Sequence, residues 1–222
     1  MADKKQQPKK TNAKGAPPPK PVKKDPVEFW FDFSSPYAYI ASTLIDDIAE
    51  EYGRTVTWRP FLLGPIMKQS GNVPLLAQPL KGDYTRRDSA RLARFFEVPF
   101  TLPEPFPIAA LAATRGFYWL EATAPDKAVP FAMACLERYY VDGQDISQAE
   151  EVAAAAETVG VDANALLEAV ADQQWKDKAK AMVEEAIAKG VCGSPFFFVD
   201  GEPFWGADRL WMVEEWLESG GW

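Results

Sequence analysis

The sequence has no histidine and only two cysteines, Cys135 and Cys192, among its 222 residues. The two cysteines lie far apart and form no CxxC pair, which excludes a dithiol redox centre and a zinc site built from cysteine and histidine. General acid–base chemistry by histidine is excluded as well. A chain with few, unpaired cysteines is typical of the reducing cytoplasm, so we predict that location and no bound metal.

Long apolar runs are also missing. No stretch approaches the roughly 20 consecutive apolar residues that cross a bilayer, and the N-terminal stretch lacks the apolar core of a secretory signal. Hydrophobic residues nevertheless make up 47% of the chain, which is enough for a large buried core. We therefore expect a folded protein with no membrane association.

Charge is distributed unevenly along the chain. Residues 1–24 hold eight lysines and one acid, which leaves 16 basic and 31 acidic residues in the rest, a net charge of −15. Such a body repels phosphate backbones, so no nucleic-acid partner is expected. Residues 1–25 are rich in lysine and proline with almost no apolar side chains, and we predict a disordered tail there.

The stretch FWFDFSSPYAYIA, at 29–41, is the most informative part of the sequence. An apolar strand, Val27 to Phe33, ends at two serines, and apolar residues at three- and four-residue spacing then predict a helix as far as Gly53. Ser35 is expected to cap this helix and Pro36 to be its first residue. The simplest interpretation of Ser35 is a structural cap, although a helix start also attracts anions.

A second informative stretch is GVCGSPFFFVDGEPFWGADRLW, at 190–211. Ser194-Pro195 precedes a short apolar strand, Phe196 to Val199, and a proline in that position is a candidate for a cis peptide bond. A turn, another short strand and a C-terminal helix from about Ala207 should follow. A strand–helix turn early in the chain and a proline loop late in it are the two ends of a thioredoxin-like fold.

The middle of the chain divides into strand, loop and helices. Thr55 to Phe61 predicts a strand parallel to the first, and the many glycines and prolines of 62–84 predict a long irregular loop with a helical turn near Ile66 to Gln69. The expected helices are 85–96, 108–122, 128–141, one opened by a capping box at Ser147 and Glu150, one capped by Asp162, and 175–189. The predicted fold class is therefore α/β: a thioredoxin-like domain of residues 26–84 and 190–222 with an all-helical insertion of residues 85–189.

Four segments give a more specific resemblance: FDFSSPYAYIA, RPFLLGPIMKQSGN with the following KGDY, Ser194-Pro195, and FWGADRL. Over nearly its whole length after residue 26, the chain resembles the DsbA-like proteins that use glutathione. These are the 2-hydroxychromene-2-carboxylate isomerases and the kappa-class glutathione transferases. Where thioredoxin-like oxidoreductases carry CxxC, this chain has Ser35-Pro36-Tyr37-Ala38. The resemblance implies that glutathione brings the thiol and that the Ser35 hydroxyl donates a hydrogen bond to its thiolate.

The resemblance also implies which residues hold glutathione. Asn72 and Lys81 would contact the tripeptide, the backbone of Ser194 ahead of Pro195 would pair with its cysteinyl part, and Ala207 with Asp208 would hold the γ-glutamyl end. Each residue also has a plainer interpretation, because an asparagine after glycine suits a turn, a lysine suits solvent and an aspartate suits a helix start. Candidate walls for the second substrate are Trp58, Phe61, Phe106 and Trp205.

The predicted function is a cytoplasmic, homodimeric isomerase of the 2-hydroxychromene-2-carboxylate class, with glutathione as cofactor and a small aromatic or unsaturated acid as substrate. Such enzymes belong to the degradation of aromatic compounds. A kappa-class transferase, which would keep the glutathione adduct, is an alternative. A non-catalytic DsbA-like binding protein that lost its cysteines is a further one. Glutathione binding separates the last class from the first two, and consumption of glutathione separates those two from each other.

Overall fold

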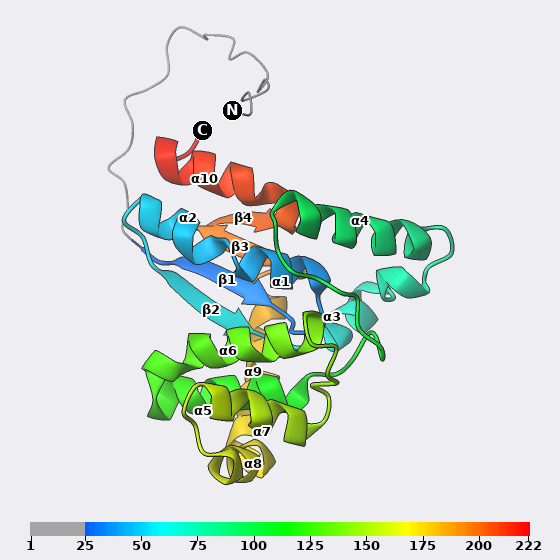
Figure 1. Cartoon of the computed structure of the whole chain (residues 1–222). Helices are drawn as coiled ribbons and strands as arrows, with labels where there is room; N and C mark the ends of the chain where they lie inside the picture. The colour runs from blue at the N-terminus through cyan, green and yellow to red at the C-terminus, as the bar shows by residue number, and fades with distance from the viewer. Residues whose placement is uncertain (1–24) are drawn as a thin grey trace, which may run out of the picture.

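A computed structural model describes residues 25–222, so the tail predicted for 1–25 lies, except for Asp25, outside the described residues. The core of the fold is a four-stranded sheet of order β2-β1-β3-β4 (Figure 1). β1 (Val27–Phe31) pairs in parallel with β2 (Val56–Pro60), as predicted, and antiparallel with β3 (Phe196–Val199). β4 (Glu202–Trp205) completes the sheet beside β3. The two ends of the described chain therefore build one mixed sheet.

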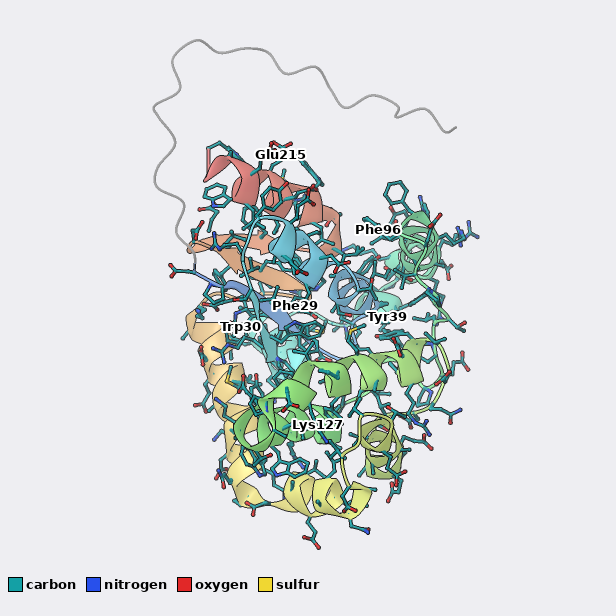
Figure 2. All side chains as sticks on the ribbon, turned by 60° about the vertical axis from the view of Figure 1, so that its left-hand side comes forward. Phe29, Trp30, Tyr39, Phe96, Lys127 and Glu215 are labelled. Atoms are coloured by element: carbon teal, nitrogen blue, oxygen red, sulfur yellow. The ribbon has the colours of Figure 1, made fainter. Side chains whose placement is uncertain are left out.

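β1 is the central buried strand. Phe29, Trp30 and Phe31 are all fully buried, and the Phe29 ring stacks on Phe31 and Phe197 with ring centroids 5.0 and 5.5 Å apart. Figure 2 shows Phe29 and Trp30 inside the molecule, with helices around them. Consecutive buried side chains on a strand mean that both faces of the sheet are covered, which explains why this strand has no polar–apolar alternation.

Helices α1 (Pro36–Ser42), α2 (Ile45–Glu51) and α10 (Leu210–Ser219) lie on one side of the sheet (Figure 1). The prediction of one helix as far as Gly53 is wrong, because the chain breaks between α1 and α2. At the break the hydroxyl of Ser42 donates to the Tyr39 carbonyl at 2.7 Å, and that of Thr43 donates to the Ile40 carbonyl at 2.8 Å. Such bonds compete with the helical backbone pattern. α1 is consequently a short element at the end of β1.

The segment predicted as an irregular loop is partly helical. It contains α3 (Leu63–Ser70) and the 3-10 turn η1 (Leu75–Ala77), and α4 (Lys81–Phe95) begins ahead of the predicted Thr85. The first N–H of α3 donates to the buried carboxylate of Asp32 at 2.6 Å. Pro65 lies in the first turn, where a helix does not need its N–H. The cap of α3 thus comes from a residue far away in the sequence.

The remaining helices pack against one another on the opposite side of the sheet (Figure 1). They are α5 (Leu111–Thr123), α6 (Pro125–Tyr140), α7 (Ala149–Thr158), α8 (Ala163–Ala171) and α9 (Gln173–Ala188). Asp162 caps α8 as predicted, by accepting from the Ala165 N–H at 2.8 Å.

The predicted capping box at Ser147 is wrong. Gln148 is the N-cap of α7, and the Ser147 N–H is used in a bond to Asp145 at 3.0 Å. The architecture as a whole is the predicted α/β fold with helices inserted between the two halves of the sheet. The exact division into two domains stays a prediction.

Candidate active site

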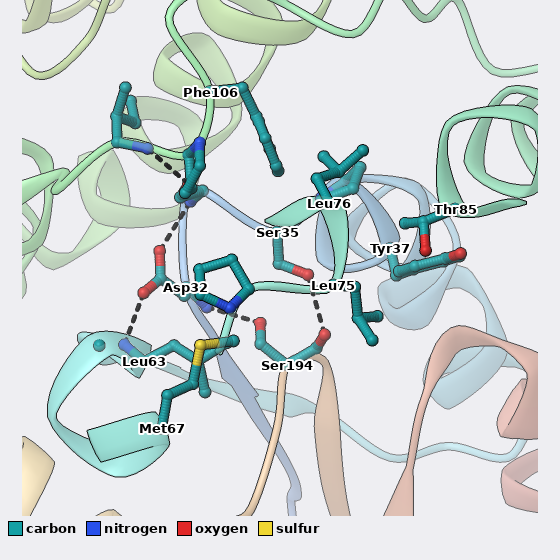
Figure 3. A pocket seen from close by; sticks show the side chains of 16 residues that line it. Asp32, Ser35, Tyr37, Leu63, Met67, Leu75, Leu76, Thr85, Phe106 and Ser194 are labelled. Atoms are coloured by element: carbon teal, nitrogen blue, oxygen red, sulfur yellow. Dashed lines mark hydrogen bonds between the residues drawn. The ribbon is translucent and has the colours of Figure 1, made fainter. Parts of the chain in front are cut away.

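A cavity of about 200 Å³ opens where the end of β1 meets α1 (Figure 3). Its walls come from α1, α3, η1, the start of α4, the segment 106–108 and the loop before β3. The polar lining residues are Asp32, Ser34, Ser35, Tyr37, Thr85 and Ser194, and the apolar ones are Pro36, Leu63, Met67, Pro74, Leu75, Leu76, Phe106, Pro107 and Ile108. The cavity is therefore an apolar pocket with hydroxyl groups and one carboxyl group.

Ser35 lies at the N-terminus of α1 and is only 7% exposed. Its hydroxyl oxygen accepts a hydrogen bond from the Ala38 N–H at 3.2 Å, which confirms the predicted cap. The same hydroxyl donates to the carbonyl of Ser194 at 2.8 Å. Ser35 therefore caps the helix and also joins it to the loop before β3.

Ser194 makes a second hydrogen bond between the same two segments. Its hydroxyl oxygen accepts from the backbone N–H of Asp32 at 2.8 Å. The Ser194–Pro195 peptide bond is cis, as predicted, and two further cis bonds, Glu104–Pro105 and Phe106–Pro107, occur beside the cavity where sequence reasoning did not place them.

Asp32 is a site residue that sequence reasoning missed. Its side chain is buried, and its two oxygens accept from the N–H groups of Ser34 at 2.7 Å and Leu63 at 2.6 Å. Burial raises the pKa of this carboxyl to about 6, although the two N–H donors act in the opposite direction. The available signal was an acidic residue inside the aromatic run FWFDF, directly before the two serines.

Ser34 and Tyr37 connect the turn to neighbouring segments. The Ser34 hydroxyl oxygen accepts from the Ile108 N–H at 3.0 Å, which fixes the segment that carries Phe106. The Tyr37 hydroxyl donates to Asp88 of α4 at 2.8 Å. Burial first, and then the bond to Asp88, raise the pKa of Tyr37, so its phenol is neutral. α4 is thereby held against α1 at the edge of the cavity.

The other predicted glutathione ligands fall into two groups. The Pro195 carbonyl accepts a hydrogen bond from the Gly206 N–H at 3.0 Å, so the 3-10 turn η2 (Ala207–Arg209) lies beside the cis-proline loop. η2 also contacts α1. Ala207 in it is buried, whereas Asp208 is exposed and bonds Arg209 at 2.6 Å.

Asn72 and Lys81 form the second group. Both are exposed, and they flank the segment 74–76 that lines the cavity without lining it themselves. The structure thus brings Ser35, Ser194, Pro195 and the η2 turn to one end of the sheet. Contacts of any of these residues with glutathione stay a prediction.

Of the four predicted wall residues only Phe106 lines the cavity, and the prediction is wrong for the others. Trp58 is a core residue whose ring meets Phe29 edge-on, with ring centroids 5.1 Å apart. Phe61 is likewise fully buried. Trp205 is 59% exposed and lies over Gly193, where an added Cβ would collide with the indole ring. For Trp58 and Trp205 the side-chain direction of β2 and β4 decides the position, and composition does not reveal that direction.

The geometry defines a thioredoxin-like fold whose strand–helix turn carries serine where a thiol pair would stand. The family model described as the DSBA-like thioredoxin domain matches residues 26–218, and the chain belongs to this family. It is 32% identical over 193 residues to 2-hydroxychromene-2-carboxylate isomerase of Sphingobium xenophagum, covering 86% of this chain and 97% of that protein. It is 27% identical over 208 residues to glutathione S-transferase kappa 1 of Homo sapiens, covering 86% and 92% of the two chains.

A solved structure of a 2-hydroxychromene-2-carboxylate isomerase superposes with a TM-score of 0.78 at 26% identity, covering 86% of this chain and 94% of that chain. Within residues 25–222, no group of three or more acidic or cysteine side chains is placed to hold a metal ion. In that same range no helix has both the length and the apolar character that a bilayer crossing requires.

Proposed function

We propose that the protein is a glutathione-dependent isomerase of the 2-hydroxychromene-2-carboxylate class. One observation supports this most: Ser35 and Ser194, from opposite ends of the chain, face one mainly apolar cavity. The chain around that cavity is 32% identical to a named isomerase along 97% of that protein's length. A shared family and a shared length argue for a shared type of reaction, whereas fold alone would not.

The residues around the cavity fit a bound glutathione. The Ser35 hydroxyl and the Ser194 backbone are suited to its cysteinyl part, Ala207 and Asp208 to its γ-glutamyl end, and the exposed side chains of Asn72 and Lys81 to its outer part. Pro195 keeps the Ser194 loop next to the η2 turn through the Gly206 bond. When bound, glutathione would supply a thiolate that adds reversibly to an unsaturated carbon, so that the neighbouring carbon–carbon bond is free to rotate.

Ser35 has the central part in this proposal. Its hydroxyl has one proton, which it gives to the Ser194 carbonyl in this structure, and it would turn that proton toward the thiolate when the ligand is bound. A hydrogen bond to the anion lowers the pKa of a thiol from its usual value of about 8.5. The apolar walls, including Met67, Leu75 and Phe106, exclude water and so strengthen this bond.

A kappa-class glutathione transferase is the second candidate. It is favoured by the 27% identity to glutathione S-transferase kappa 1 of Homo sapiens along 92% of that protein. The isomerase relative is more similar, which places the isomerase first. The third class, a non-catalytic DsbA-like binding protein, is disfavoured because Ser35, Asn72, Lys81 and Asp208 are all present together.

Two measurements on the full chain test the proposal. Calorimetric titration with glutathione should show saturable binding, whereas its absence would favour the non-catalytic class. Conversion of a 2-hydroxychromene-2-carboxylate, followed by its ultraviolet spectrum, should require glutathione and should fall in Ser35→Ala. Ser219→Ala is the matched control, because the Ser219 hydroxyl is exposed, does not line the cavity and bonds only within its own helix end, to Glu215 and Gly221.

We further propose that the enzyme is a cytoplasmic homodimer. Both cysteines are unpaired, and the exposed thiol of Cys192 suits a reducing compartment. Apolar side chains are exposed along η1 and α4, among them Leu80 at 93% and Phe95, and a second copy of the chain would cover such a surface. Light scattering after size exclusion should give twice the chain mass, and Leu80→Asp should shift that mass toward the monomer.

A further inference from the structure

The carboxyl group of Asp32 takes no direct part in the proposed reaction, yet both of its oxygens are hydrogen-bonded at the cavity. Asp32 directly follows β1 and is 6% exposed. One oxygen accepts from the Ser34 N–H and the other from the Leu63 N–H, while its own N–H donates to Ser194. Figure 3 shows the carboxylate turned toward Leu63 and the Ser35 hydroxyl turned toward Ser194. Asp32 therefore bonds three segments that meet at the cavity.

We propose that Asp32 is a positioning residue, whose ionised form holds the Ser34–Ser35 turn and the start of α3 together, and that its protonation releases one of them. This inference rests on the proposed function, in which the Ser35 turn is the reactive part of the site. The reason lies in hydrogen-bond capacity. A carboxylate accepts at both oxygens, whereas a neutral carboxylic acid keeps one good acceptor and turns the other oxygen into a donor.

Protonation of Asp32 would therefore leave either the Ser34 or the Leu63 N–H without its partner. The Ser34 N–H belongs to the turn that orients Ser35, and Leu63 begins the helix whose residues Leu63 and Met67 form one wall of the cavity. A loosened turn changes where the Ser35 hydroxyl lies. A loosened α3 changes the shape of the wall. Either change lowers turnover without removing a group that touches the substrate.

The surroundings of Asp32 explain why this switch falls near neutral pH. The titratable groups that face it are phenols: Tyr139 and Tyr140 of α6, and Tyr37 of α1 across the cavity. Burial first, and then nearby anions including Asp32, raise the pKa of Tyr139 and Tyr140, so both are neutral. α3, the segment 106–108 and Ser194 offer backbone, hydroxyl and apolar groups. Within the described residues Asp32 has no ion-pair partner, and burial brings its pKa to about 6.

Stability and activity should respond to pH in opposite directions. The pKa of Asp32 in the fold, about 6, lies above its ordinary value of 3.8. As the pH falls through about 6, the folded state binds a proton that the unfolded chain does not bind, so this group makes the fold more stable. Activity, which needs the carboxylate, should fall over the same range by about tenfold per pH unit. A residue with a purely structural role would move both quantities in the same direction.

The direct test is NMR on the full chain without glutathione. The Asp32 carboxyl carbon should titrate near pH 6, and the amide signals of Ser34 and Leu63 should shift with the same midpoint. Asp32→Asn has one acceptor oxygen and no charge, so its Ser34 and Leu63 amides should not titrate. Its kcat/KM should be lower, and its acid limb, the fall of kcat/KM below about pH 6, should be shallower because only the glutathione thiol still titrates. Asp32→Glu should restore part of that limb.

Asp46→Asn is the matched control. The Asp46 carboxyl is also raised in pKa, by burial first, and bonds the Trp58 indole at 3.3 Å, away from the cavity. This variant should keep the acid limb. Amides of Ser34 and Leu63 that stay unchanged through the Asp32 titration would overturn the inference, as would an unchanged acid limb in Asp32→Asn. Absence of any glutathione-dependent turnover would overturn the proposed function instead, and the amide titration would still decide the role of Asp32.

Discussion

The hydroxyl oxygen of Ser35 lies 2.8 Å from the carbonyl oxygen of Ser194 and donates its proton to it. This single bond joins the first helix of the fold to the loop before β3, on two segments that the whole helical insertion separates in sequence. The proton that stabilises an anion in the proposed reaction is therefore already directed into the cavity region. A ligand has only to compete with one carbonyl group for it.

Replacing Ser35 with alanine should reduce turnover strongly and stability weakly. Losing one hydrogen-bond donor to a developing or stabilised anion lowers kcat by roughly 10²- to 10³-fold. Losing a helix cap costs about 1 kcal/mol. Steady-state kinetics and denaturant unfolding of the same preparation measure both effects. Full activity in Ser35→Ala would shift the donor role to Ser34 or to backbone N–H groups.

Replacing Ser194 with alanine should reduce stability strongly and turnover only weakly. The Ser194 side chain accepts from the Asp32 N–H, and its loss leaves a buried donor without a partner, at about 1–3 kcal/mol. The Ser194 carbonyl, which bonds Ser35, is backbone and stays in place. Thermal unfolding should show the loss, while kcat for the folded protein stays within a few-fold of the wild type. A drop in kcat as large as that of Ser35→Ala would show that the Ser194 hydroxyl itself takes part.

Replacing Tyr37 with phenylalanine should loosen α4. The variant removes the 2.8 Å bond to Asp88 and keeps the ring that lines the cavity. The free energy of unfolding should fall by about 1.5–3 kcal/mol, since the acceptor is a carboxylate. Hydrogen exchange should speed up in residues 81–90. Tyr84→Phe is the control, because its exposed hydroxyl bonds the same Asp88 at 3.1 Å and its loss should matter less. Equal protection of α4 in both variants would show that Tyr37 does not hold this helix.

Local signals in the sequence were sufficient for part of this fold. The aromatic run of β1, the Ser35-Pro36 helix start, the Asp162 cap and the proline ahead of β3 each depend on neighbours within a few residues. Propensity and capping rules describe such neighbours well. The same rules gave a wrong capping box at Ser147, because the Ser147 N–H donates to Asp145 instead.

Features that depend on distant partners could not be predicted. α3 begins where it does because Asp32 accepts from Leu63, and no local pattern around Leu63 reveals that acceptor. The break after α1 depends on whether the hydroxyls of Ser42 and Thr43 bond the preceding backbone carbonyls, as they do here, or leave them to the helix. Trp58 was expected in the cavity wall as one of four aromatic candidates. Its place in the core follows from the register of β2 against Phe29.

In the proposed reaction glutathione acts at the Ser35 site without being consumed. The most direct measurement follows substrate, product and glutathione together by proton NMR while the enzyme converts a 2-hydroxychromene-2-carboxylate. Product should form only when glutathione is present, and the glutathione concentration should stay constant over many turnovers. Product formation without glutathione, or loss of one glutathione for each substrate converted, would contradict the account.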